Sequence, residues 1–257
     1  YNQYITKEKE IVIGIVQRIE KKNVIVQIGK IDAILAPNEQ IPGEQYKFMD
    51  RIKVYVVEVK QTTKGPQIYV SRTHPELVKR LFEQEVPEVF DGTVEIKSIA
   101  REEGSRTKIS VKAEVPNVDP VGACVGINGA RVKAIVNELG NEQIDIIEWD
   151  ENPAQYIVNA LSPAKVVSIS ACDDENGKKA TVVVSDQQLS LAIGKAGQNV
   201  RLAAKLTGYG IDIKSESQIE DSAKPESDDE TDIDDDMLVF SEDTDTQAET
   251  DADEVNE

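Results

Sequence analysis

The stretch Gly126-Ile127-Asn128-Gly129 recurs as Gly194-Lys195-Ala196-Gly197, and the two copies lie 68 positions apart. Each copy stands between segments whose apolar residues have helical spacing. Glycine permits a sharp backbone turn because it has no Cβ, and another chain can approach it closely for the same reason. The repeated Gly-x-x-Gly motif therefore indicates two related modules, one after the other.

The elements around the two motifs follow one order. The first copy is predicted to contain a helix at 75–83, strands at 94–100 and 109–113, a helix from Asp119-Pro120, a helix that ends near Gly140, and a strand at 144–146. The second repeats it with a helix at 153–161, strands at 166–171 and 180–184, a helix from Asp186, a helix that ends near Gly208, and a strand at 211–213. Asn152 before Pro153 is a favourable N-cap. The order helix-strand-strand-helix-helix-strand, twice, predicts two tandem type II KH domains.

The motif suits a phosphate backbone. The first amides of the following helix are unpaired and lie at the positive end of its dipole, so they attract phosphate oxygens. KH domains hold about four nucleotides in this way. The alternative is a plain helix-turn-helix corner that needs glycine only for its geometry. The candidate RNA-binding residues of the first copy are Gly126, Ile127, Asn128, Gly129, Arg131 and Lys133. Those of the second copy are Gly194, Lys195, Ala196, Gly197, Gln198, Arg201 and Lys205.

Residues 1–73 contain short apolar runs at 11–19, 24–28, 32–36, 52–60 and 67–71, separated by turn signals. Five short strands with a long connection after the third predict a closed, S1-type OB-fold β-barrel. Tyr55 is expected on its outer side. Arg18, Lys21 and Lys22 could follow a phosphate backbone, or they could be ordinary solvated charges. The second and third strands carry no aromatic residue on which a base could stack.

Charge divides the chain into a body and a tail. The formal net charge is −19, and residues 215–257 carry 19 acidic residues against the single Lys224. Such a segment is expected to be a disordered acidic tail. Within it, Met237-Leu238-Val239-Phe240 is either a docking segment or sequence drift. The expected organisation is a barrel at 1–73, a first KH module at 74–150, a second KH module at 151–214, and the tail from 215.

Several classes of function find no support in the residues. The single His74 stands at a module boundary, and no cysteine, histidine or carboxylate cluster has the spacing of a catalytic, metal or cofactor site. Cys124 and Cys172 are expected to be buried free thiols in a reducing cytosol. No run of 18 apolar residues and no signal-like segment is present, so a soluble, cytoplasmic protein is expected. We also expect a monomer that is not an enzyme and holds no cofactor.

Longer stretches carry a family resemblance. They are 54–59, 64–67, 71–75, 117–126 and 188–195, which include Ser71-Arg72-Thr73-His74-Pro75 and Leu189-Ser190-Leu191-Ala192-Ile193-Gly194-Lys195. Together with the module order, they resemble the NusA family of transcription elongation and termination factors over residues 8–216. The resemblance implies binding to nascent single-stranded RNA, modulation of polymerase pausing, and roles in termination and antitermination. It also implies contact with RNA polymerase through an N-terminal domain that this chain lacks, and with other elongation or antitermination factors.

One alternative has a different function. RNA-processing exonucleases also combine KH and S1-type modules, so the chain could be the RNA-handling part of such an enzyme. The order favours a transcription factor, because the exonuclease arrangement places the KH module before the barrel.

Overall fold

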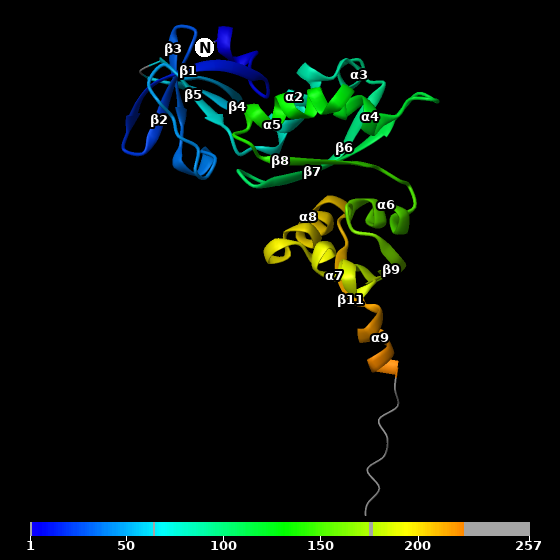
Figure 1. Ribbon diagram of the computed structural model, residues 1–257. Coiled ribbons are helices and arrows are strands. Elements are labelled where there is room, and N and C mark those ends of the chain that lie inside the picture. The colour runs from blue at the N-terminus through cyan, green and yellow to red at the C-terminus, as the bar shows by residue number, and fades with distance from the viewer. Residues whose placement is uncertain (1, 64, 175–176, 224–257) are drawn as a thin grey trace, which may run out of the picture. The chain divides into compact units, whose positions relative to one another are not determined.

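The computed structural model describes residues 2–63, 65–174 and 177–223 (Figure 1). A short helix, α1 (Asn2–Ile5), precedes the barrel. The barrel strands are β1 (Ile11–Glu20), β2 (Asn23–Ile28), β3 (Ile31–Leu35), β4 (Arg51–Thr62) and β5 (Gly65–Ser71), with the 3-10 turn η1 (Pro37–Glu39) after β3. They close in the order β1-β2-β3-β5-β4, with β3 and β5 parallel. The predicted five-stranded closed barrel is thus confirmed.

The barrel core consists of alternating apolar side chains, including Val24, Val26 and Ile28 of β2. The expectation for Tyr55 is wrong in one respect. Its side chain leaves the barrel interior, but only 6% of the residue is exposed, because it packs into the core of the following module. The His74 ring stacks on the Tyr55 ring with a centroid distance of 4.6 Å.

The first KH module has the predicted element order, with one additional short helix, α3, before its first strand. Its helices are α2 (Pro75–Glu85), α3 (Pro87–Phe90), α4 (Pro120–Val125) and α5 (Ala130–Glu138), with the 3-10 turn η2 (Ile127–Gly129) between the last two. Its strands are β6 (Val94–Glu102), β7 (Arg106–Ala113) and β8 (Gln143–Glu148). Strand β6 pairs antiparallel with β7, and β8 adds parallel to β7. Helices α2, α4 and α5 bury their apolar faces against this sheet.

The second KH module repeats the arrangement. Its helices are α6 (Pro153–Ala160), α7 (Asp186–Ile193) and α8 (Gln198–Thr207), with the 3-10 turn η3 (Lys195–Gly197) between the last two. Its strands are β9 (Val166–Asp174), β10 (Gly177–Val184) and β11 (Gly210–Ser215). The sheet order is β11-β10-β9, with β11 parallel to β10. Asn152 caps α6 as predicted, since its side chain accepts a hydrogen bond from the amide of Ala154.

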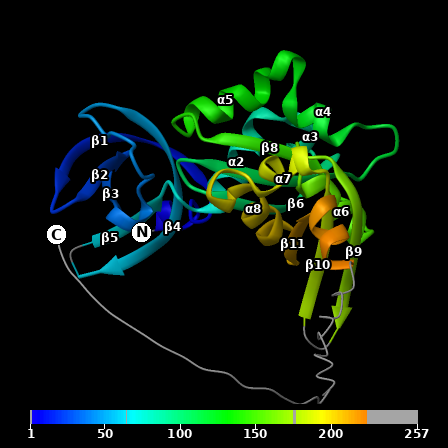
Figure 2. The same cartoon turned by 60° about the horizontal axis from the view of Figure 1, so that its bottom comes forward.

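The apolar core of the second KH module extends onto the first module. Ala100 and Ile147 of the first module pack into the cluster formed by the second. The Tyr156 hydroxyl lies 2.9 Å from Ser110 Oγ, and Lys108 Nζ donates to the Ser162 carbonyl at 2.8 Å. Helix α8 also packs against strands β6 and β7 (Figure 2). These apolar and polar contacts across the boundary oppose independent motion of the two modules.

The structure differs from expectation at the start of the predicted tail and at one cysteine. Helix α9 (Glu216–Ala223) follows β11 directly, where the tail is predicted to begin. The rest of the predicted tail, with its apolar segment at 237–240, lies outside the described residues. Cys124 is buried, but Cys172, on the edge strand β9, is exposed, contrary to the expectation of two buried thiols. None of the described helices is both long and apolar enough to cross a membrane.

Candidate nucleic-acid interface

The two Gly-x-x-Gly loops have the same backbone conformation. Gly126 has φ 74° and ψ 173°, and Gly194 has φ 77° and ψ 172°. The third loop positions, Asn128 and Ala196, are both left-handed, with φ of 53° and 51°. The similarity of the loops, predicted from sequence spacing, is therefore also a similarity of geometry.

The first glycine of each loop is required by its backbone and its surroundings. Few residues other than glycine adopt a φ near +75° with an extended ψ. A Cβ at Gly194 would lie 2.7 Å from Asn199 Cβ and 2.8 Å from the Asn199 amide nitrogen. A Cβ at Gly126 would lie 2.7 Å from Arg131 Cγ. The loops thus run in contact with the first turn of the helix that follows.

The helices after the loops begin without a side-chain cap. Gly129 precedes α5 and Gly197 precedes α8, and neither position offers a side-chain acceptor for the first amides of the helix. Exposed amides at the positive end of a helix dipole can bind an anion. In each module the loop thus leads into an uncapped helix N-terminus, whose first amide (Ala130 or Gln198) donates to the carbonyl of Ile127 or Lys195 within the loop.

The first loop borders a cleft of about 550 Å³. Its lining combines the loop with the helices on either side and with α3: Glu88, Gly122, Ala123, Gly126, Ile127, Ala130 and Arg131. The Ile127 side chain stands at the mouth of this cleft and is 86% exposed. An exposed apolar side chain beside the N-terminus of a helix can contact a base while the helix amides hold the phosphate.

The cations of the first loop differ in availability. Arg131 Nη1 donates to Glu88 Oε2 at 2.8 Å and to the Ala123 carbonyl at 2.7 Å, so its guanidinium holds the loop together. Lys133 is exposed, and its Nζ donates to the Asn128 carbonyl at 2.9 Å. Of the two, Lys133 is the cation that can turn toward a phosphate.

The second loop carries more positive charge. Lys195 and Lys205 are exposed. Arg201 Nη1 donates to the Ala196 carbonyl at 3.0 Å, while its other nitrogens pair with Glu102 of the first module. The Gln198 side chain also donates to Glu102, at 2.8 Å. The hydrogen bond from Arg201 lowers the pKa of Glu102, so this carboxylate stays ionised in the neutral range.

The barrel cations have a separate environment. Arg18 pairs with Glu20 of its own strand at 2.5 Å and with Asp32 of β3 at 3.0 Å. Lys21 and Lys22 are exposed in the turn between β1 and β2. Pairing reduces the charge that Arg18 can offer, whereas the two lysines remain solvated.

Sequence reasoning missed the groups that hold the site in place. Glu88 and Glu102 are 43 and 99 residues from the arginines they bind. Asn199 is buried, and its Nδ2 donates to the Leu161 and Ala192 carbonyls. The sequence repeat could have pointed to Asn199, because the 68-residue offset between the two copies aligns it with Arg131.

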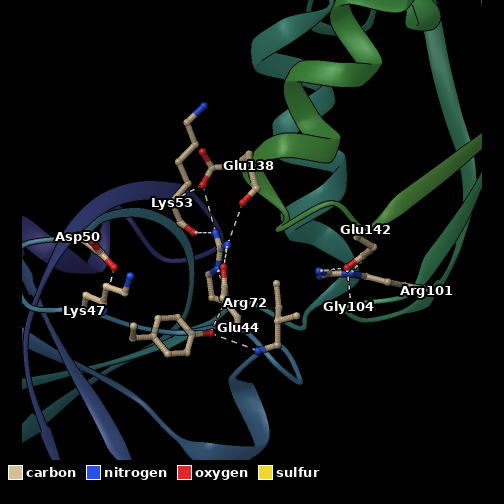
Figure 3. Close-up of polar contacts among 11 residues, drawn as sticks. Glu44, Lys47, Asp50, Lys53, Arg72, Arg101, Gly104, Glu138 and Glu142 are labelled. Carbon is tan, nitrogen blue, oxygen red and sulfur yellow. Dashed lines mark hydrogen bonds and ion pairs between the residues drawn. The ribbon is translucent and has the colours of Figure 1, made fainter.

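A buried arginine anchors the far end of α5 to the barrel. Arg72 follows β5 and is 1% exposed. Its Nη1 donates to Glu138 Oε1 and the Lys53 carbonyl, and its Nη2 to the Glu138 carbonyl and to Glu44 (Figure 3). Glu138 is the last residue of α5, so the loop helix of the first module is fixed at both ends.

Comparison with protein families assigns all three modules. An S1 RNA-binding domain matches residues 6–71, a NusA-like first KH domain matches 72–149, and a NusA-like second KH domain matches 153–221. These assignments agree with the barrel and the two KH folds described above.

Curated relatives carry the same name in several bacteria. The transcription termination/antitermination protein NusA of Bacillus subtilis is 61% identical over 84% of this chain and 58% of its own length. Its counterpart from Thermus thermophilus is 50% identical over 86% of this chain and 57% of its own length. That of Mycobacterium bovis is 47% identical over 88% of this chain and 67% of its own length. The chain thus spans somewhat more than half of the relatives' length. These similarities support a transcription factor and not the exonuclease alternative.

Proposed function

Because this chain belongs to the NusA family of transcription termination/antitermination proteins, we propose that it binds nascent single-stranded RNA at RNA polymerase. Through that binding it modulates pausing, termination and antitermination. The activity belongs to the whole transcription complex, and the described residues supply its RNA-binding part. The protein works without catalysis, as a monomer in the cytoplasm.

The observation that carries this proposal is the pair of equivalent loops. Each places two glycines with positive φ ahead of an uncapped helix, and each adds at least one exposed lysine beside it. Two such loops in modules that pack on one another suit a continuous single strand better than a small ligand. RNA polymerase and other elongation or antitermination factors would be engaged through surfaces beyond these loops.

Charge reversal in the second loop tests the proposal. Lys195→Asp with Ala196→Asp places two carboxylates at the phosphate path, so we expect RNA affinity to fall at least about tenfold at low salt. Asp tolerates the left-handed conformation at position 196 better than most residues, so the loop should keep its shape. Fluorescence anisotropy with a labelled single-stranded RNA of about 12 nucleotides and randomised sequence measures the change.

The control is Lys179→Asp, which reverses one exposed lysine of the same module on strand β10. Lys179→Asp makes the same change of charge as the single substitution Lys195→Asp, but at a position away from the loop. The corresponding pair in the first module, Ile127→Asp with Asn128→Asp, should also weaken binding. If the double variant of the second loop binds as tightly as the unchanged protein, the assignment of that loop is wrong.

A further inference from the structure

The loop cations of the two KH modules are equivalent in position but not in surroundings. Lys133 and Arg201 both lie seven residues after the first glycine of their loop. Each donates to the carbonyl of the third loop residue, at 2.9 Å for Lys133 and 3.0 Å for Arg201. Among the described residues Lys133 has no ion-pair partner, whereas Arg201 is paired with Glu102 of the other module.

The Glu102 contact is bidentate and crosses the boundary between modules. Arg201 Nε lies 2.5 Å from Glu102 Oε1, and Nη2 lies 3.0 Å from Oε2. Gln198, in the first turn of α8, donates both to Glu102 Oε2 and to Ser105 Oγ. The turn between β6 and β7 of the first module therefore lies against the phosphate-binding end of the second.

A buried network fixes this turn. Glu142 is fully buried and accepts hydrogen bonds from Arg101 Nε, Arg101 Nη2 and the Gly104 amide (Figure 3). Thr107 Oγ1 donates to Glu142 as well. Arg101, Gly104 and Thr107 flank Glu102 in the sequence. The fold of the first module therefore holds the Glu102 carboxylate beside Arg201.

We propose that Glu102 competes with RNA phosphate for Arg201 and so lowers the RNA affinity of the second KH module. A carboxylate and a phosphate use the same two donors of a guanidinium, and only one of them can occupy both at once. Glu102 also adds a negative charge beside the path of a polyanion. The first module lacks this competitor at Lys133, so the two modules differ in how readily they take up a phosphate.

Solvent limits the size of the effect. Arg201 is 46% exposed and Glu102 is 21% exposed, so the pair is screened and its strength is that of a partly exposed ion pair. The competition therefore tunes binding and does not abolish it.

The inference rests on the proposed RNA-binding function, and Glu102→Gln tests it. Glutamine has nearly the same shape but no charge, so Arg201 becomes available to phosphate. We expect RNA to bind about three- to tenfold more tightly near 0.05 M salt, with a steeper salt dependence by up to about 0.7 in the log-log slope. Tighter binding cannot result from misfolding. The readout is anisotropy with the same labelled RNA of about 12 nucleotides.

Two further variants isolate the contact. Glu103→Gln removes the same charge from the neighbouring, exposed residue and should change the affinity by less than about twofold. In an Arg201→Gln background, Glu102→Gln should gain no more affinity than Glu103→Gln does, because only the loss of a nearby negative charge remains. Equal gains from Glu102→Gln and Glu103→Gln would show general charge repulsion and overturn the proposal.

Other outcomes distinguish a failure of this inference from a failure of the proposed RNA-binding function. Weaker or unchanged binding by Glu102→Gln overturns the competition, provided that the Lys195→Asp, Ala196→Asp variant loses affinity. In that case the loop still binds RNA, and the function stands. If that double variant also binds normally, the second loop is no RNA site, so this inference fails together with the assignment of that loop.

Discussion

Gly194 combines two constraints that its neighbours in the sequence do not reveal. Its φ of 77° with an extended ψ is nearly exclusive to glycine, and a Cβ there would collide with the backbone of α8. We expect Gly194→Ala to lower the free energy of unfolding by more than about 3 kcal/mol, because both strain and overlap must be relieved. Urea denaturation followed by circular dichroism measures this loss.

Gly208 provides the matched comparison. It also has a φ of 77°, but it is a left-handed C-cap, and a Cβ added there would meet no atom within 4 Å. Gly208→Ala should therefore cost only about 1 to 2 kcal/mol, the usual penalty for a left-handed alanine. Equal losses for the two substitutions would show that the close approach of the first loop glycine to α8 has no energetic weight.

The helices of the KH modules differ in how their first turns are closed. Asn152 accepts from the Ala154 amide at 3.0 Å, whereas Ser185 at the start of α7 makes no side-chain cap hydrogen bond. Asn152→Ala should lower the free energy of unfolding by about 1 kcal/mol, since it leaves an amide without its acceptor. Thermal denaturation of the two single variants compares them directly.

Ser185→Ala serves as the control because Ser185 is also an N-cap residue, but its side chain makes no cap hydrogen bond that the substitution could remove. It should change the stability by less than about 0.5 kcal/mol. A larger loss for Ser185→Ala than for Asn152→Ala would contradict the idea that the side-chain cap, and not the cap position itself, stabilises these helices.

The connection between barrel and first KH module depends on Arg72. Its guanidinium is buried between Glu44 and Glu138, with the Lys53 carbonyl as a further acceptor. Arg72→Ala should cost about 3 kcal/mol, because two largely covered carboxylates and the Lys53 carbonyl lose their donor. Separate unfolding transitions for barrel and KH modules in calorimetry would accompany the loss.

Arg72→Lys tests the geometry of the contact. Lysine keeps the charge but cannot donate in two directions from a planar group, so it should recover only part of the stability. A lysine variant as stable as the unchanged protein would mean that charge alone joins the modules. An alanine variant that still unfolds in one transition would mean that the apolar contact through Tyr55 is sufficient.

The sequence alone predicted the closed barrel, the repeated helix and strand order, the N-cap at Asn152 and the two Gly-x-x-Gly loops. These features depend on local signals: apolar periodicity, capping residues and glycine at fixed positions. The loops were also found because the repeat shows the same pattern twice. Local physical chemistry was sufficient for each of them.

Tertiary structure alone decided which charges of the site are free. Arg201 and Glu102 are 99 residues apart, and Arg72 and Glu138 are 66 apart, so no local pattern links them. The burial of Tyr55 and the exposure of Cys172 likewise depend on which surface another element covers. Packing of one module on another sets these partners, and that packing is a property of whole surfaces that the periodicity of a single segment does not encode.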